Sequence, residues 1–149
     1  FGEPKGFSEG LLLIEEVTPS NNHIGSYFVN TDGELLTDAR GKFLYRDARP
    51  FSDGLAPVRL RSHLPWKQAW LFIDHSGRKA FSQSFDNALP FSDGLALVRQ
   101  SQQWFFVNKK GERVTDYFDR ADSFYEGLAW VKKNGEEYFI DRSGRRFCS

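Results

Sequence analysis

The sequence contains a single cysteine, no methionine and no long hydrophobic run. Cys148 alone cannot form an intramolecular disulfide, and it excludes zinc sites built from two or four cysteines, but it leaves the redox compartment open. Apolar runs are short. Residues 11–14, for example, are followed directly by Glu15 and Glu16. This excludes a transmembrane helix, which needs about 20 apolar residues, and one globular domain is the expectation for a chain of 149 residues.

An excess of positive charge is also absent. The chain has 20 Lys and Arg residues against 20 Asp and Glu residues. A nucleic-acid-binding domain normally carries a basic surplus, so we expect no nucleic-acid partner. The chain begins at Phe1 and has no targeting segment of charged and then apolar residues, which we interpret as a fragment or processed form of a longer protein.

Common enzyme motifs are missing as well. The sequence has no Gly-x-Ser-x-Gly elbow, no phosphate-binding Gly-rich loop and no His-Glu-x-x-His motif. The two catalytic carboxylates of a glycosidase can lie on loops without a regular spacing in the sequence, so the missing motifs do not exclude a glycosidase. His23 and His63 lack a carboxylate at ligand spacing and give weak evidence for a metal site. We expect no catalysis, no cofactor and no bound metal.

Internal repetition is the main positive feature of the sequence. An aromatic-x-acid-Gly-Leu block occurs four times, at residues 7–11, 51–55, 91–95 and 124–128. Each block is followed by an aromatic-β-branched-Asn/Asp triplet with Gly three positions later, at residues 28–30, 72–74, 106–108 and 139–141. A further aromatic precedes each first block by six residues, at Phe1, Tyr45, Phe85 and Phe118. Dividing the chain at these aromatics gives four units, residues 1–44, 45–84, 85–117 and 118–149.

These blocks resemble the WG repeat, a bacterial family with a Trp-Gly pair just before an aromatic-Ile-Asp block and Phe-x-Glu-Gly-Leu-Ala-x-Val upstream. The resemblance covers essentially the whole chain. The family Trp is present at Trp70 and Trp104 but is replaced by Ser26 and Glu137 in the outer units. The family Gly is replaced in all four units, by Tyr27, Leu71, Phe105 and Tyr138. The resemblance implies an interaction or surface module, with no catalytic residues to carry over.

Strand and turn signals predict the structure of each unit. Residues 95–99 and 104–107 are β-branched and aromatic and flank a polar tip, which indicates an antiparallel hairpin. Asn108 with Gly111 indicates a type I turn leading into a third short strand at residues 112–115. We therefore predict an all-β fold of four β-meanders stacked as an open array, with a closed ring, propeller-like or barrel form as the alternative. Each block Phe is expected to dock into the preceding unit, and each neighbouring acid to accept from donors within its own turn.

Function is expected where the repeats differ. The spacing between the β-branched anchors is 15 residues in units 1 and 2 but 9 in units 3 and 4, so the first two units carry longer hairpin tips. Equivalent loops of adjacent units should emerge side by side and form one surface. Trp66 lies outside the repeat pattern, and exposed Trp is a frequent interface anchor. The predicted binding residues are Glu15, Glu16, His23, Ile24, Arg61, His63, Leu64, Pro65 and Trp66.

Charge is distributed unevenly along the repeats. Unit 1 has 3 bases and 7 acids, whereas unit 2 has 7 bases and 3 acids. This polarity is explained equally by pairing between neighbouring units and by a surface that steers a charged partner. The leading hypothesis is a non-catalytic scaffold that binds another protein. The alternatives are glycan binding through aromatics such as Tyr27, Trp70 and Trp104, and a toxin-neutralising subunit.

Overall fold

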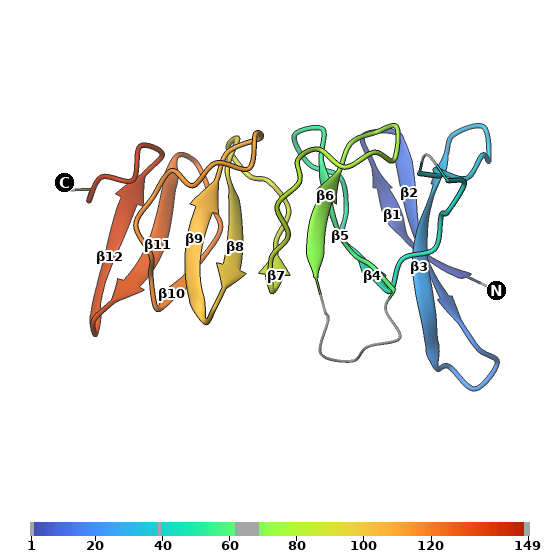
Figure 1. Cartoon of the computed structure of the whole chain (residues 1–149), viewed down its shortest axis with the longest axis horizontal. Coiled ribbons are helices and arrows are strands. Elements are labelled where there is room, and N and C mark those ends of the chain that lie inside the picture. The colour runs from blue at the N-terminus through green and yellow to red at the C-terminus, as the bar shows by residue number, and fades with distance from the viewer. Residues whose placement is uncertain (1, 39, 62–68, 148–149) are drawn as a thin grey trace.

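A computed structural model shows four three-stranded antiparallel sheets in a row (Figure 1). The structure describes residues 2–38, 40–61 and 69–147. In this part of the chain every regular element is a strand, so there is no helix that could cross a membrane. The all-β prediction is confirmed.

Each sheet takes its strands from one sequence unit, in the order of the chain. Unit 1 contains β1 (Gly2–Ser8), β2 (Leu11–Val17) and β3 (His23–Asn30). Unit 2 contains β4 (Asp47–Ala48), β5 (Ala56–Arg59) and β6 (Trp70–Ile73). Unit 3 contains β7 (Asn87–Ala88), β8 (Ala96–Gln100) and β9 (Gln103–Val107). Unit 4 contains β10 (Arg120–Ala121), β11 (Leu128–Lys133) and β12 (Glu136–Asp141).

The acid-Gly pair in each repeated block forms a tight hairpin turn. In unit 3, Asp93 and Gly94 have φ angles of 55° and 79°, and the Ser92 N–H donates to the Leu95 carbonyl at 2.8 Å. Two left-handed central residues define the type I′ turn, whose twist matches that of antiparallel strands and which favours Asp-Gly. All four blocks have the same pair of positive φ angles, which explains why Gly recurs at this position.

A second repeated turn follows the last strand of each sheet. The Asn108 side-chain oxygen accepts hydrogen bonds from the backbone of Lys110 at 2.9 Å and Glu112 at 3.0 Å. Gly111 is left-handed, with a φ angle of 79°, and its N–H donates to the Asn108 carbonyl. This arrangement matches the predicted type I turn followed by a left-handed Gly.

The strand predicted at residues 112–115 is wrong, because this segment forms only a single bridge between Val107 and Arg113. The edge of β9 is occupied instead by the next unit: Trp104 and Phe118 exchange backbone hydrogen bonds of 2.9 and 2.7 Å. A longer strand after Gly111 would compete with that pairing. The third strand in units 2, 3 and 4 is therefore the two-residue segment before the repeated block, such as β7 in unit 3. In unit 1 it is the seven-residue β1, which extends into the block at Phe7 and Ser8.

Three hydrophobic cores lie between consecutive units. The block Phe of one unit packs edge-on against a strand Phe of the preceding unit, as predicted. The ring centroids are 4.9 Å apart for Phe28 and Phe51, 4.9 Å for Phe72 and Phe91, and 4.6 Å for Phe106 and Phe124. Each core also holds the Leu of a block and a linker aromatic. No unit completes a core alone, so the units depend on one another for burial.

The row of sheets does not close. Strands β1 and β12 lie at opposite ends of the molecule, with the other units between them (Figure 1). The structure therefore agrees with the open array and not with the ring, propeller-like or barrel alternative.

Candidate functional site

The repeated acids connect neighbouring units. The Gly54 N–H donates to the Glu9 carboxylate at 3.0 Å, and the Gly94 N–H donates to the Asp53 carboxylate at 2.9 Å. The Gly127 N–H donates to Asp93 at 2.7 Å in the same way. We expected these acids to accept from their own turns, and the structure corrects this: each acid reaches the turn of the following unit. The type I′ turn projects the side chain toward the next sheet, which the sequence pattern of one unit does not reveal.

The described ends of the two long tips, at Arg61 in unit 2 and Ile24 in unit 1, lie next to each other. The Arg61 guanidinium donates to the backbone carbonyl of Ile24 at 2.9 Å, across the boundary between the two units. Glu15, His23, Ile24 and Arg61, four of the predicted binding residues, lie in this region. The predicted residues His63, Leu64, Pro65 and Trp66 lie outside the described residues.

His23 makes one contact within unit 1 and one with unit 2 through its two ring nitrogens. Nδ1 lies 3.0 Å from a Glu15 carboxylate oxygen, and Nε2 lies 2.5 Å from the Arg46 carbonyl oxygen. Both neighbours are acceptors, so both hydrogen bonds form together only when both nitrogens carry a proton. A hydrogen bond from Lys5, with a further one from His23, holds the pKa of the Glu15 carboxyl below its usual value against the opposing effect of burial.

Glu16, the remaining predicted binding residue, acts on Tyr27 of the adjacent strand. Burial first, and then the charge of Glu16 and a hydrogen bond to it, raise the pKa of the Tyr27 hydroxyl. His23 and Ile24 at the start of β3, Arg46 before β4 and Arg61 after β5 line a hollow of about 420 Å³. Ile24 has 37% of its surface exposed, so this hollow presents apolar surface beside two arginines.

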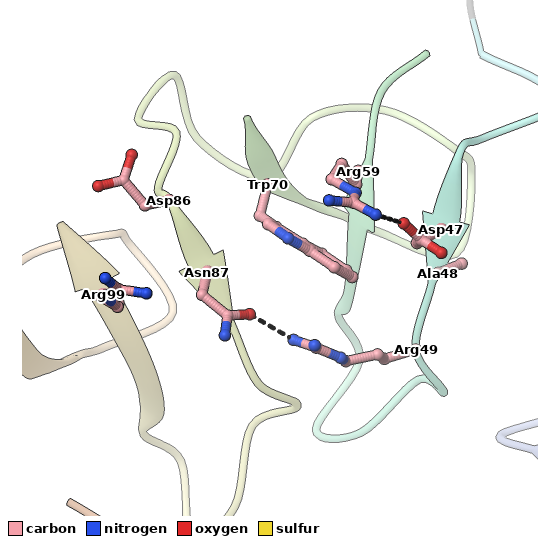
Figure 2. Close-up of a pocket in the computed structure, with 8 residues that line it drawn as sticks. All are labelled: Asp47, Ala48, Arg49, Arg59, Trp70, Asp86, Asn87 and Arg99. Atoms are coloured by element: carbon pink, nitrogen blue, oxygen red, sulfur yellow. Dashed lines mark hydrogen bonds and ion pairs between the residues drawn. The ribbon is translucent and has the colours of Figure 1, made fainter. Parts of the chain in front are cut away.

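A second hollow of about 350 Å³ lies between units 2 and 3 (Figure 2). The Arg49 guanidinium lies 4.1 Å from the centre of the Trp70 ring and donates to the Asn87 side-chain oxygen at 2.9 Å. It also donates to the Ala88 carbonyl. Burial lowers the pKa of Arg49. The Arg49 side chain therefore joins the two units through a cation–π contact with Trp70 and charged hydrogen bonds to Asn87 and Ala88. We call this set of contacts the Arg49 clamp.

The Arg49 clamp was not predicted, although the sequence carries a signal for it. Units 1, 3 and 4 carry Lys5, Leu89 and Asp122 at the position of Arg49, so the clamp is specific to one boundary. It also covers one of the aromatics considered for glycan binding, because Trp70 is only 5% exposed. Trp104 packs against the third core and Tyr27 packs edge-on against Phe43. These three aromatics interlock with the fold and do not form an open platform.

The histidines and acids of the described residues do not form a group of three or more that could hold a metal ion. His75 instead lies 2.8 Å from the Glu9 carboxylate and packs against the Phe51 ring. Its contacts are those of a side chain that joins units 1 and 2.

The comparisons with known proteins agree with this repeat architecture. Residues 42–62, 72–104 and 104–136 match the WG containing repeat, and together these segments cover more than half of the chain. The second match runs from β6 of one unit to β9 of the next, so the family repeat spans one stacking step. The search of curated proteins and the search of solved structures each gave no match. The chain belongs to the WG-containing repeat family.

Proposed function

We propose that this chain is a non-catalytic scaffold that binds another protein through the paired tips of units 1 and 2. The observation that carries the proposal is the hydrogen bond from Arg61, where the unit 2 tip begins, to the carbonyl of Ile24, just after the unit 1 tip. The cores at the three unit boundaries are built from repeated residues, whereas the tips differ in length between units. Insertions in stacked repeats commonly gather on the binding face.

The chemistry of the tip hollow favours a protein partner. Exposed Ile24 supplies apolar area, and Arg46 and Arg61 supply guanidinium groups that pair with carboxylates. Buried apolar and Arg anchors are typical of interface centres. The acidic unit 1 and basic unit 2 would orient a partner of complementary polarity, and association would weaken as salt increases.

The absence of catalysis is part of the proposal. Three of the four repeated carboxylates, those of Glu9, Asp53 and Asp93, accept hydrogen bonds from Gly N–H groups of the next unit. The Asp74 and Asp141 carboxylates accept from the backbone of their own turns. A role in the fold therefore accounts for these acids without a reaction.

Site-specific photo-crosslinking in the source cells tests the proposal. A photoreactive residue replacing Ile24 in the full chain should crosslink to a partner protein, and the matched probe at Leu35 should not. Leu35 is also exposed, at 44%, but lies beyond the opposite end of β3. Arg61→Glu and Trp66→Ala should each reduce the Ile24 crosslink several-fold without changing the circular dichroism spectrum. Equal crosslinking from both probes, or full yield in both variants, would refute the assignment.

A further inference from the structure

We propose that a hollow between the linker of unit 1 and strand β6 of unit 2 binds a small molecule with a carboxylate group and an apolar body. The hollow has a volume of about 370 Å³, within the range of about 300–1,000 Å³ that is usual for small-molecule sites. Among the described residues, none lines both this hollow and the tip hollow. The proposal does not depend on the proposed function.

The floor of the hollow is apolar. Leu71 and Ile73 of β6 line it and belong to the core between units 1 and 2, where they are 4% and 2% exposed. Leu60, which follows β5, also lines the hollow and packs against the same core. This surface favours a ligand with an apolar body, because contact with it removes that body from water.

Tyr45 lines the hollow with a hydroxyl that the fold does not use. The side chain is 4% exposed, and its hydroxyl is buried without a hydrogen-bond partner within the described part of the chain. Burial, and then the charge of Asp38, raise the pKa of Tyr45 to about 12, so the hydroxyl lies toward the turn that carries Asp38. A bound carboxylate oxygen would accept a hydrogen bond from this hydroxyl and relieve the cost of leaving it unpaired.

The rim of the hollow is basic. Four exposed cations line it, Arg40, Lys42, Arg78 and Lys79, against the single acid Asp38 among its described lining residues. The Asp38 carboxylate already accepts the backbone N–H groups of Arg40 at 2.8 Å and Lys42 at 2.9 Å. None of the four cations has an ion pair within the part of the chain that the structure describes. The rim therefore favours an anion, and its two guanidinium groups match the geometry of a carboxylate.

An insertion in the linker builds one wall of the hollow. From the turn glycine to the linker aromatic, unit 1 spans 12 residues (33 to 45), whereas units 2 and 3 span 8 (77 to 85) and 7 (111 to 118). The extra residues form a turn at residues 38–42, in which the Gly41 N–H donates to the Asp38 carbonyl at 3.0 Å. This turn carries two of the four cations, Arg40 and Lys42.

The next boundary has an aromatic side chain in the corresponding place. Phe81 follows the turn glycine of unit 2 by four residues, as Thr37 does in unit 1. Its ring centroid lies 6.4 Å from that of Phe85, the counterpart of Tyr45, and a Cβ on Gly111 would lie 2.5 Å from the Phe81 ring. Gly111 is the counterpart of a glycine that lines the hollow. The site is therefore specific to the boundary between units 1 and 2.

Isothermal titration calorimetry on the full chain tests the proposal. The carboxylate probes are octanoate and 2-naphthoate, which have an alkyl and an aryl body. The matched neutral probes are 1-octanol and 2-naphthylmethanol, and inorganic phosphate is the anion without an apolar body. At least one carboxylate should bind with a 1:1 stoichiometry, about tenfold or more tighter than its alcohol or phosphate, because the charged group pairs with the basic rim.

Three variants locate the binding. Arg40→Glu should weaken carboxylate binding by about tenfold or more, because it replaces an attractive charge on the rim by a repulsive one. Tyr45→Phe should weaken it several-fold without lowering the melting temperature. Lys110→Glu is the matched control and should bind like the native chain. Lys110 occupies the same turn position as Arg40, since its N–H donates to the Asn108 side chain as that of Arg40 does to Asp38.

Three results would overturn the proposal. They are a chain that binds neither carboxylate, alcohols that bind as tightly as the carboxylates, and full affinity in both Arg40→Glu and Tyr45→Phe. The failure of this proposal is distinguishable from that of the tip assignment, because Arg40→Glu should leave the crosslink from Ile24 unchanged.

Discussion

Units 1 and 2 differ most from units 3 and 4 in their hairpin tips. In units 3 and 4 the hairpins close with two-residue turns. One turn lies between the paired residues Gln100 and Gln103, and the other lies between Lys133 and Glu136. Units 1 and 2 carry six more residues between the same anchors. The stacking contact is nevertheless the same in both halves, with ring separations of 4.9 Å for Phe28 and Phe51 and 4.6 Å for Phe106 and Phe124. Stacking is therefore independent of tip length, because the inter-unit core lies away from the tips.

The largest expected effect compares two phenylalanines at equivalent strand positions. Phe106→Ala should lower the free energy of unfolding by about 3–5 kcal/mol, because it empties a buried site between units 3 and 4. Phe139→Ala should cost less than about 1 kcal/mol, because half of that side chain is already exposed. Urea unfolding at low protein concentration measures both values. Similar costs would show that unit 4 is stabilised differently from the inner units.

The next comparison concerns one glycine turn in two contexts. Gly33 and Gly77 both have a φ angle of 81°, so alanine at either position is strained by about 1–2 kcal/mol. A Cβ at Gly77 would also lie 2.4 Å from the Thr37 carbonyl oxygen, whereas a Cβ at Gly33 meets nothing within 4 Å. Gly77→Ala should therefore destabilise the protein by about 1 kcal/mol or more beyond Gly33→Ala. Thermal unfolding of the pair tests this, and equal melting temperatures would contradict it.

The short hairpins of units 3 and 4 allow a stabilising test. Their turns have the same left-handed geometry, but unit 4 uses Asn134-Gly135 and unit 3 uses Ser101-Gln102, with φ angles of 52° and 67°. Replacing Ser101-Gln102 by Asn-Gly should raise the free energy of unfolding by about 1 kcal/mol, because Asn and Gly tolerate this conformation. The Ser101 N–H bond to Asp86 involves only the backbone and should persist. A melting temperature that stays the same or falls would contradict this prediction.

The smallest expected effect concerns Tyr45, whose counterparts are Phe85 and Phe118. Its hydroxyl is buried and has no hydrogen-bond partner within the described part of the chain. Tyr45→Phe should therefore leave stability unchanged or raise it by up to about 1 kcal/mol at pH 7.

Tyr45 should also make stability depend on alkaline pH. Burial, with a smaller contribution from the charge of Asp38, raises the pKa of Tyr45 to about 12 from a usual value of 10. The neutral hydroxyl is favoured in the folded state, so this contribution is complete below pH 10 and is lost as the pH rises through about 12. Urea titrations between these pH values should show a smaller loss in Tyr45→Phe than in the native chain. Identical losses would show that Tyr45 does not cause the dependence.

Much of the fold could be predicted from single units because its signals are local. The Asp93-Gly94 pair closes a hairpin by its own backbone preferences, and Asn108 caps a turn within four residues. The packing of block Phe residues on the preceding unit could also be predicted, because a block Phe such as Phe124 has no partner within its own hairpin. The end of each unit could not be predicted in this way. Residues 112–115 have a strand-like pattern, but Phe118 of the next unit takes the neighbouring edge.

The candidate site was predicted only in outline. Different tip lengths led us to place the binding surface on units 1 and 2, since insertions are visible in a sequence, and this assignment stays a prediction. The Arg49 clamp on Trp70 was not found, because a side chain that crosses a unit boundary leaves only an isolated substitution in the repeat.

The sequence by itself determined the all-β class, the four units, both repeated turns and the packing of each block Phe on the preceding unit. These features depend on backbone preferences and hydrophobic spacing, which act over a few residues. Only the tertiary structure decided that the array is open, that Glu9, Asp53 and Asp93 reach the following unit, and that Phe7 and Phe139 remain exposed at opposite ends. The reason is physical: a repeated residue has the same local preferences in every unit, but its burial depends on whether another unit is stacked against it.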